Sequence, residues 1–243
     1  MTYNIHSCVN MDGKVLPQRI ADVIQKFDPD VVALQEVDAN IPCTHNQKQA
    51  EILADALDMD FRFFPVVTRG SQEYGLAMLS RLAFQNVTVG WLPALNPRLK
   101  LNLQKRGIMW TVFETSAGTV NIFNTHLSLF RLERRRQLKA ILSEDWIMAV
   151  PAKEAVILCG DLNAVPLSAV YRRLSRYLDD AQKSSGNSSR AQSTFPSRGP
   201  IFRIDHIFIS NHFRSLKTVV PTDGSSRLAS DHLPLCADLQ LIA

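Results

Sequence analysis

Short apolar runs of β-strand length recur along the whole chain, and they constrain its fold more than any other feature of the sequence. They lie at 30–36, 61–67, 75–80, 107–113, 119–126, 155–159, 203–209 and 233–241. Several follow one another without a helical pattern between them, which excludes a simple alternation of strand and helix. The sequence therefore predicts strand-rich α/β layers.

Apolar residues at helical spacing separate some of these runs. Two predicted helices have apolar faces formed by Leu16, Ile20, Val23, Ile24 and Phe27, and by Ala50, Leu53, Ala54 and Leu57. Further helices are predicted after residue 130 and over 167–178. We predict a single domain over residues 1–243, within which the Ser-, Gly- and Pro-rich stretch 182–200 is a surface loop.

The composition of the 243-residue chain is that of a globular protein, with 46% hydrophobic and 21% charged residues. No apolar run approaches the roughly 20 residues that a bilayer-spanning helix needs. The first residues lack the basic start and apolar stretch of a signal peptide, so a cytoplasmic location is expected. The cysteines show no CxxC spacing and are expected to be reduced, with neither a disulfide framework nor a zinc site: Cys8, Cys43, Cys159 and Cys236.

The charge balance favours an anionic partner. The net charge is +4 and the sequence pI is near 9.0, which fits nucleic acid, phosphorylated small molecules and anionic lipid headgroups alike. The densest basic cluster, RLERRRQLK at 131–139, lies on a predicted helix. We interpret most of its arginines as a solvated helix surface.

The run AVILCGDLN, residues 155–163, is the most informative motif. Its apolar residues predict a buried strand that delivers Asp161 and Asn163 onto a turn at its C-terminal end. Side chains at the exit of a buried strand are held rigidly and yet remain open to a substrate. Gly, Asp and Asn also favour ordinary turns, so this motif indicates a functional site only together with other polar residues of the sequence.

Further polar residues stand at the ends of predicted strands. They are Asn4, His6, Glu36, His126, Asp205, Asp231 and His232. Asp205 lies inside an apolar strand, where an unpaired charge would be unfavourable, so it requires a partner such as a histidine. Asn4, His6 and His206 can each be explained by local hydrogen bonding, and a lone histidine such as His126 is more often structural than catalytic.

Together these side chains supply what metal-assisted phosphoryl chemistry requires. Carboxylates such as Glu36, with Asp161 or Asp231 nearby, are hard oxygen ligands that suit Mg²⁺. A histidine that is oriented and charged by an aspartate suits an anionic transition state. Asparagine side chains can hold phosphate oxygens without adding negative charge.

The order of these motifs carries a family resemblance. TYNIH, LQEVD, GLAMLSR, NTHL, GDLN, RIDHIF and SDHLPL resemble motifs of the endonuclease/exonuclease/phosphatase family, the DNase I-like superfamily, from Asn4 to about Leu235. The resemblance implies a four-layered α/β (α+β) sandwich, with two mostly antiparallel sheets packed together and helices outside. It also implies a metal-dependent hydrolase of phosphoric ester bonds, of the bacterial hydrolase branch.

The resemblance implies roles in metal and substrate binding for four residues, and His6 is added as a candidate. Glu36 matches the principal magnesium ligand, with Asn4 beside it and Asp231 as a further carboxylate of the metal site. Arg106 stands where many bacterial members carry an arginine before a strand. We count Arg106 and His6 as candidate substrate-binding residues.

The catalytic roles that the resemblance implies fall on the later motifs. Asp161 and Asn163 match the pair that positions the attacking water and the scissile phosphate. His232 matches the histidine at the reaction centre, and Asp205 matches the carboxylate that orients it. His126 matches a second phosphate-binding histidine.

The chain departs from the family pattern at several positions. His6 stands where members related to abasic-site endonucleases carry an aspartate, which weakens the case for a second metal ion. The same members have Tyr-Pro-Asn where this chain has Thr-His-Leu, which argues against abasic-site repair. Leu76 follows Gly75 where many bacterial relatives have asparagine, and Cys43 stands where relatives often have arginine.

The sequence as a whole predicts a Mg²⁺-dependent phosphoesterase, with Mn²⁺ as a substitute, that cleaves a phosphodiester by in-line attack of water. A phosphomonoesterase of the same fold and a non-catalytic binding protein on this scaffold stay open as alternatives. The expected partner is an anionic phosphoester, with nucleic acid, a lipid headgroup and an inositol phosphate as candidates. Aromatic residues are only 8% of the chain and Phe130 alone adjoins the basic run, so nucleic acid is not strongly favoured. A monomer is the default expectation.

Overall fold

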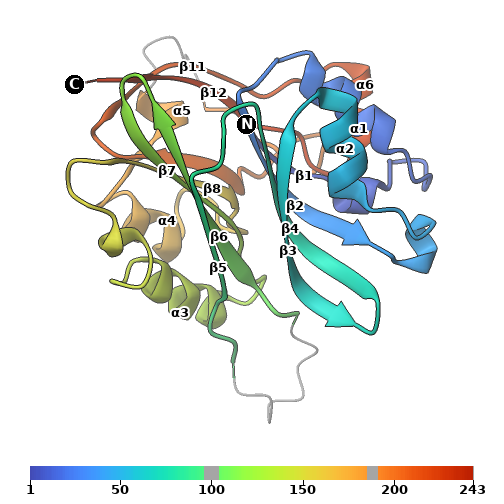
Figure 1. Cartoon of the computed structure of the whole chain (residues 1–243), viewed down its shortest axis with the longest axis horizontal. Helices are drawn as coiled ribbons and strands as arrows, with labels where there is room; N and C mark the ends of the chain where they lie inside the picture. The colour runs from blue at the N-terminus through green and yellow to red at the C-terminus, as the bar shows by residue number, and fades with distance from the viewer. Residues whose placement is uncertain (96–103, 185–190, 243) are drawn as a thin grey trace.

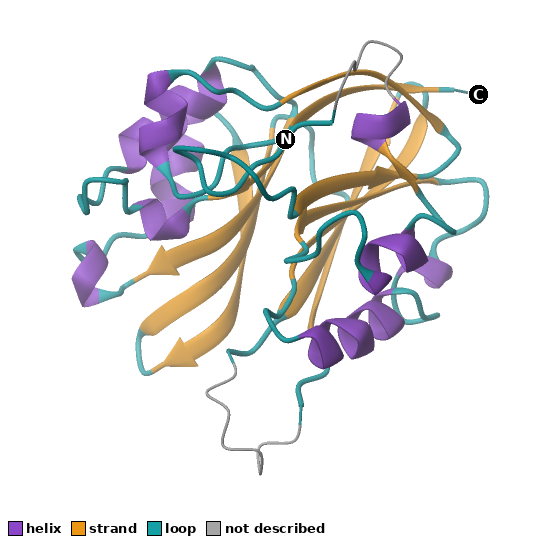
Figure 2. Ribbon diagram, turned by 180° about the vertical axis from the view of Figure 1, so that it is seen from behind, coloured by secondary structure: helices purple, strands orange, loops and turns teal. Residues whose placement is uncertain are grey.

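A computed structural model describes residues 1–95, 104–184 and 191–242. Two β-sheets pack face to face with helices on both outer sides (Figure 1, Figure 2). This arrangement confirms the predicted four-layered α/β sandwich. Among the described residues, no helix is both long enough and apolar enough to cross a membrane.

The first sheet has four strands and the second has six. The order in the first sheet is β1 (Thr2–Asn4), β2 (Val31–Ala39), β4 (Gln72–Ser80) and β3 (Asp60–Arg69). The order in the second is β5 (Asn86–Trp91), β6 (Gly107–Thr115), β7 (Gly118–His126), β8 (Ala155–Asp161), β10 (Asp205–Ile209) and β9 (Asp179–Asp180). Strands β11 (Phe213–Val219) and β12 (Cys236–Leu241) form a separate antiparallel pair. The pairs β1–β2 and β7–β8 are parallel, and the other pairs in the two sheets are antiparallel.

Helices cover each sheet on its outer side. On the first sheet lie α1 (Pro17–Gln25), α2 (Gln49–Leu57) and α6 (Gly224–Ala229), and on the second lie α3 (Arg131–Ile141) and α4 (Ala169–Leu174). The short helix α5 (Ala181–Ser184) packs on β10 and β11. Single 3₁₀ turns occur at His6–Cys8, Pro42–Thr44 and Ile147–Ala149.

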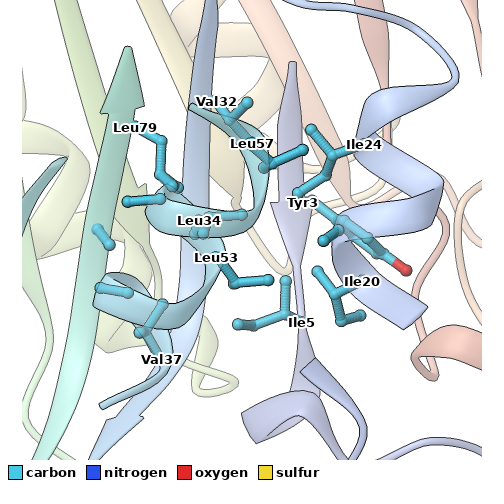
Figure 3. Close-up of a cluster of buried hydrophobic side chains, with 14 of the residues drawn as sticks. Tyr3, Ile5, Ile20, Ile24, Val32, Leu34, Val37, Leu53, Leu57 and Leu79 are labelled. Atoms are coloured by element: carbon cyan, nitrogen blue, oxygen red, sulfur yellow. The ribbon is translucent and has the colours of Figure 1, made fainter. Parts of the chain in front are cut away.

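Alternation of side chains along the strands divides the hydrophobic core into three layers, because successive residues of a strand point to opposite faces. In β2, Leu34 packs with Ile20 of α1 and Leu53 of α2 (Figure 3). Its neighbour Ala33 belongs instead to the layer between the two sheets, which contains Phe113. A third layer lies between the second sheet and helices α3 and α4.

A buried polar network connects the two sheets. Gln35 of β2 donates from Nε2 to Asn124 Oδ1 of β7 at 2.8 Å. Asn124 in turn donates to the backbone oxygens of Leu34 at 2.9 Å and Ala77 at 3.0 Å. Since buried polar groups are unfavourable unless they are paired, this network restricts how one sheet can slide on the other.

The structure differs from the sequence-based expectations at several segments. Helix α4 is shorter than the predicted helix 167–178, because it begins at Ala169, after the capping residue Ser168, and ends at Leu174. Beyond Leu174 the bonding is irregular, with bonds to the Leu174 oxygen from Tyr177 N at 2.8 Å and from Leu178 N at 3.0 Å. The stretch 182–200 was predicted as a surface loop, but it begins inside α5, and Thr194 and Ser197 are fully buried. Its residues 185–190 lie outside the described part of the chain. Strands β5 and β11 and helix α6 were not predicted, because their side chains are mostly exposed or their apolar pattern is too short.

Gly160 allows the two parallel strands β7 and β8 to approach each other closely. It pairs with Thr125 and has a φ of +137°, a conformation that side chains rarely adopt. A Cβ atom at this position would lie 1.9 Å from the backbone oxygen of Thr125. The glycine of the GDLN motif is therefore a steric requirement of the sheet.

We expect Gly160→Ala to destabilise the fold by roughly 3 kcal/mol or more, because the methyl group meets rigid backbone in a strained conformation. Urea unfolding measures this loss. Gly199→Ala is the matched control, since a Cβ atom there meets nothing within 4 Å. Equal stability of the two variants would contradict this interpretation.

A buried ion pair lies at the outer edge of the second sheet. Arg203 Nη2 lies 2.5 Å from Asp180 Oδ2, and the hydroxyl of Tyr171 also donates to this carboxylate. Burial works to raise the pKa of Asp180, but the hydrogen bonds and charge of Arg203 and the Tyr171 hydroxyl outweigh it and lower the pKa. Asp180 therefore stabilises the folded state in its charged form.

We expect Asp180→Asn to reduce the free energy of unfolding at neutral pH by about 3–5 kcal/mol, because Arg203 would remain buried without its partner. The folded-state pKa of Asp180 is depressed, so its contribution is complete above the unfolded-state pKa and is lost as the pH falls towards the folded-state value. The difference between wild type and variant should thus shrink in acid. Urea unfolding at several pH values tests this, with the exposed neighbour in Asp179→Asn as control.

Candidate active site

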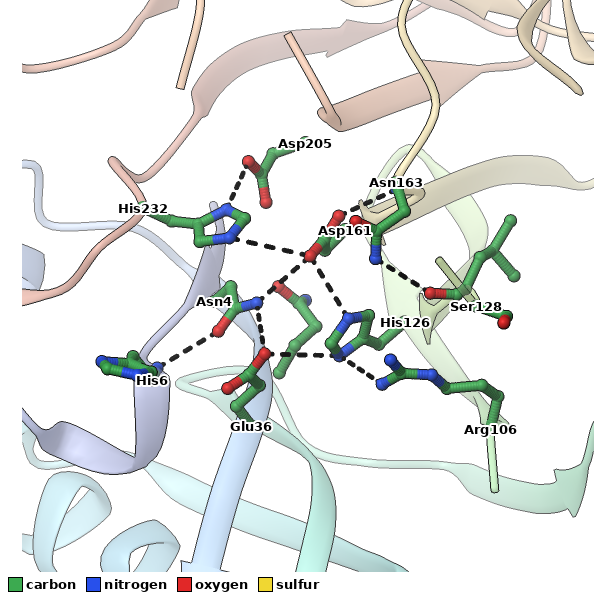
Figure 4. A network of polar contacts seen from close by, with 12 residues as sticks. Asn4, His6, Glu36, Arg106, His126, Ser128, Asp161, Asn163, Asp205 and His232 are labelled. Atoms are coloured by element: carbon green, nitrogen blue, oxygen red, sulfur yellow. Dashed lines mark hydrogen bonds and ion pairs between the residues drawn. The ribbon is translucent and has the colours of Figure 1, made fainter. Parts of the chain in front are cut away.

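A cavity of about 720 Å³ opens where strands β1, β2, β7 and β8 bring their polar residues together. Its lining includes most of the site residues predicted from the sequence: His6, Glu36, Arg106, His126, Asp161, Asn163, Asp231 and His232. Asn4 and Asp205 lie just beneath the surface, where each contacts a lining residue. Residues from distant parts of the chain thus form one cluster (Figure 4).

The carboxylate of Asp161 lies at the centre of this cluster. Its Oδ1 accepts the backbone N–H of Asn163 at 2.9 Å, and its Oδ2 accepts Asn4 Nδ2 at 3.2 Å. His126 Nε2 lies 3.3 Å and His232 Nε2 lies 3.8 Å from the same Oδ2 (Figure 4). Burial, together with the nearby charge of Asp205, raises the pKa of Asp161. A buried carboxylate in such surroundings takes up a proton more readily than an exposed one.

Asn163 is fixed by the turn that follows β8. Its φ of 47° lies in the left-handed region, which asparagine tolerates better than most residues. Its side-chain amide donates to the backbone oxygen of Leu127 at 2.9 Å. The amide of Asn163 is therefore held at the wall of the cavity, between the ends of β7 and β8.

His232 is held by Asp205. The histidine is the kind of partner that the burial of Asp205 predicts. His232 Nδ1 lies 2.9 Å from Asp205 Oδ2. Burial works to lower the pKa of His232, but the charges of Asp205 and Asp161 outweigh it and raise the pKa to about 10. The imidazole is therefore a cation at neutral pH, and its Nε2–H points towards Asp161.

His126 is in the opposite protonation state. Its Nδ1 lies 3.0 Å from Arg106 Nη1, and a guanidinium can only donate, so this nitrogen carries no proton. The hydrogen is then on Nε2, facing Asp161. Burial, with the positive charges of Arg106 and His232, lowers the pKa of His126 well below its usual range. Although carboxylates lie within ion-pair distance, His126 is neutral.

Glu36 reaches the cavity from a β-bulge. In the ladder between β2 and β4, Gln35 and Val37 are paired and Glu36 is skipped, with a φ of 57°. A bulge of this kind turns one side chain out of the regular alternation. The Glu36 carboxylate accepts Asn4 Nδ2 at 3.0 Å and is 22% exposed to the cavity.

The donor set of this cavity fits a hard divalent cation. The carboxylates of Glu36 and Asp231 both line the cavity, and oxygen ligands are those that Mg²⁺ prefers. The ligand atoms of Asp161, Asp205 and His232 lie within 4.8 Å of one another. The carboxylate of Glu36 is 22% exposed and open to an ion in the cavity, whereas those of Asp161 and Asp205 are buried. A metal-ligand role for Glu36 stays a prediction.

Asn4, His6 and Asp231 each lie within hydrogen-bond distance of a nearby residue. The amide oxygen of Asn4 accepts the backbone N–H of His6 at 3.1 Å, so its amide nitrogen faces the carboxylates. The His6 ring bonds through Nδ1 to the Val9 oxygen at 3.1 Å and lines the cavity. Asp231 Oδ1 lies 3.4 Å from Ser230 Oγ. A metal-ligand role for Asn4 and a substrate-binding role for His6 stay predictions.

Thr194 and Phe195 are among the site residues that the sequence did not predict. Thr194 Oγ1 donates to Asp205 Oδ2 at 2.5 Å, and the ring of Phe195 packs 4.8 Å from the His232 ring. Both belong to the stretch that was predicted as a surface loop. Its polar composition carries no signal for either contact, because both depend on the folding of the chain back onto β10.

Comparisons with known proteins agree with this geometry. A family model described as "Endonuclease/Exonuclease/phosphatase family" matches residues 1–232. The uncharacterized protein YbhP of Escherichia coli (strain K12) is 27% identical over 255 residues, which cover 99% of this chain and 95% of that protein. A functionally unknown conserved protein from Enterococcus faecalis V583 has a similar structure, with a TM-score of 0.82 and 21% identity over 99% of this chain and 98% of its own.

Two further solved structures are similar. One is an endonuclease/exonuclease/phosphatase from Beutenbergia cavernae DSM 12333, with a TM-score of 0.75 and 25% identity over 99% of this chain and 70% of its own. The other is the mannosyl-6-phosphatase Bt3783 of Bacteroides thetaiotaomicron VPI-5482, with a TM-score of 0.78 and 20% identity over 99% of this chain and 98% of its own. With a family match over nearly its whole length, this chain belongs to the endonuclease/exonuclease/phosphatase family, whose members hydrolyse phosphoester bonds.

Proposed function

We propose that this protein is a Mg²⁺-dependent phosphodiesterase, with Mn²⁺ able to substitute. The observation that carries the proposal is the position of the Asp161 carboxylate between a cationic and a neutral histidine, with the Glu36 carboxylate in the same cavity. This set combines a proton acceptor, a fixed positive charge and a hard oxygen ligand. In-line attack of water on a phosphoester needs all three.

Asp161 is the proposed proton acceptor. Its pKa is raised, which makes it a stronger base than an ordinary carboxylate, and its position is fixed by Asn163 and Asn4. His232 is already protonated by virtue of Asp205, so it has no free site on Nε2 to accept a proton. This difference favours Asp161 over His232 as the base.

The two histidines are proposed to stabilise the phosphate from different directions. His232 offers a charged N–H, and Asp205 holds its ring in place. His126 offers a neutral N–H whose direction is fixed by Arg106. Preorganised donors of this kind stabilise charge as it develops on the phosphate oxygens.

Glu36 is the proposed principal ligand of the metal ion, with Asp231 as a further carboxylate. When bound, Mg²⁺ supplies Lewis-acid stabilisation of the phosphate and of the leaving oxygen. Asn4 bridges Glu36 and Asp161 through its amide nitrogen, so it keeps the metal ligand and the proposed base at a fixed separation.

A diester fits the charge of the cavity better than a monoester does. Among the described residues that line it, Arg106 is the only arginine or lysine, and its guanidinium is already bonded to His126. A phosphomonoester dianion would need more positive charge than a monoanionic diester. A phosphomonoesterase is the second candidate, because the similar Bacteroides structure is a phosphatase.

We expect the protein to hydrolyse bis-p-nitrophenyl phosphate with Mg²⁺, to lose this activity in EDTA, and to act more slowly on p-nitrophenyl phosphate. Glu36→Gln should raise the Mg²⁺ concentration for half-maximal activity at least about tenfold, because it removes a charged ligand. Glu51→Gln, on the exposed surface of α2, is the control. Preference for the monoester would support the phosphatase instead, and no activity on either compound would contradict both.

Asp205→Asn tests the positioning of His232. We expect kcat to fall by about 10²–10⁴-fold, as is usual when the partner of a catalytic histidine is neutralised. The pKa of His232, followed by NMR, should fall as well, because the charge that raises it is removed. A fall in kcat without any change in this pKa would mean that Asp205 acts only by packing. Asp179→Asn should change neither quantity.

A further inference from the structure

Two neighbouring loops beside the active site expose large apolar side chains. Leu167, between β8 and α4, is 83% exposed. Leu129, before α3, is 70% exposed, and Leu132 in the first turn of α3 is 63% exposed. Phe130 and Val165 are exposed beside them. Single exposed leucines are common on protein surfaces, but a group of them on adjacent loops indicates an interaction site.

The two loops are joined at their bases and form one surface. Leu127 N donates to Asp161 O at 2.9 Å, and the Asn163 amide donates back to Leu127 O at 2.9 Å. Beyond this junction, helices α3 and α4 lie against each other on the same side of the second sheet (Figure 1, Figure 2). The loop that carries Leu167 therefore lies beside the first turns of α3, where Leu167 and Arg131 line the same hollow. We call this face, with the arginines described next, the α3–α4 surface.

Arginines gather at the centre of the α3–α4 surface. A second cavity, of about 340 Å³, is lined by Arg131, Arg134, Arg135 and Arg172 together with Leu167. Within the described ranges, Arg131, Arg135 and Arg172 form no ion pair with a carboxylate. Arg131, Arg135 and Arg136 are exposed, which agrees with the predicted solvated helix surface. The structure adds that Arg131, Arg134 and Arg135 line one hollow with Arg172 of another helix.

Arg134 connects this hollow to the active site. Its Nη1 donates to the backbone oxygens of Ser128 at 2.9 Å and Leu129 at 2.6 Å. Its Nε is buried and has no hydrogen-bond partner. Leu129 in turn lines the catalytic cavity. The arginine hollow is therefore joined to the wall of the catalytic cavity through the contact of Arg134 with Leu129.

We propose that the α3–α4 surface docks this protein on an anionic phospholipid bilayer. The leucines enter the boundary between headgroups and acyl chains, and the arginines contact lipid phosphates. This combination of apolar side chains with unpaired basic ones is how a protein binds a membrane without spanning it. Docking itself requires only the α3–α4 surface. The further step, that docking brings lipid phosphates to Asp161, rests on the proposed function.

A nucleic acid fits the same surface less well. Single strands are held by aromatic side chains that stack on bases, and here only Phe130 is aromatic among five exposed apolar residues. Aliphatic side chains such as Leu167 and Leu132 gain little from bases but gain free energy by leaving water for the acyl region. The chemistry of the α3–α4 surface therefore favours lipid.

Vesicle flotation tests this proposal. We expect the full chain to bind vesicles of phosphatidylcholine with phosphatidylglycerol, to bind pure phosphatidylcholine weakly, and to lose binding at high salt. Arg131→Gln and Arg172→Gln should each lower the partition coefficient about fivefold, the usual effect of one basic residue at an anionic surface. Leu132→Ser and Leu167→Ser should each lower it about tenfold.

Matched control variants lie on β11, away from α3 and α4 (Figure 1). Arg214→Gln and Leu216→Ser alter exposed residues there and should bind vesicles like the wild type. Thermal unfolding of every variant separates lost binding from lost folding. Asp161→Asn should also bind normally, so a failure of the proposed activity leaves this test intact.

Four results would overturn the proposal. The first two are equal vesicle binding by the surface variants and the wild type, and no vesicle binding by the wild type. The third is binding of single-stranded DNA, in place of vesicles, that the arginine variants weaken. The fourth is a dimer in sedimentation velocity that Leu132→Ser and Leu167→Ser dissociate, which would make this face a contact between two copies.

Discussion

The burial of one carboxylate, that of Asp161, is the constraint on which the rest of the site depends. A buried charge is unfavourable unless hydrogen bonds and opposite charges surround it. Here these come from Asn4 of β1, His126 of β7, the turn after β8 and His232 near the C-terminus. The carboxylate is satisfied only when both sheets and the C-terminal segment are in place. Folding and assembly of the site are thus the same event.

The two histidines show how neighbours, and not residue type, determine chemistry. His126 contacts an arginine and is neutral, whereas His232 contacts an aspartate and is cationic. Both rings direct an N–H towards Asp161, so the site offers one neutral and one charged donor around a base. The difference in charge between His126 and His232 is the basis of their different proposed roles in hydrolysis.

Much of this arrangement could be predicted from local sequence, and some of it could not. Short apolar runs identified most of the main strands. The cost of burying Asp205 among apolar residues predicted its histidine partner. The bulge that presents Glu36 and the contact of Thr194 with Asp205 depend on pairings across the fold. The convergence of arginines from α3 and α4 also depends on the fold, because the two helices are separate segments of the sequence.

A double-mutant cycle tests the central claim that Asp161 and His232 act as one unit. Single-turnover rates on a diester would be compared for wild type, Asp161→Asn, His232→Gln and the double variant. Residues that act as a unit give strongly non-additive effects. The account predicts that the double variant is no slower than the slower single variant. Rate losses that multiply would show that the two side chains act independently, and would contradict it.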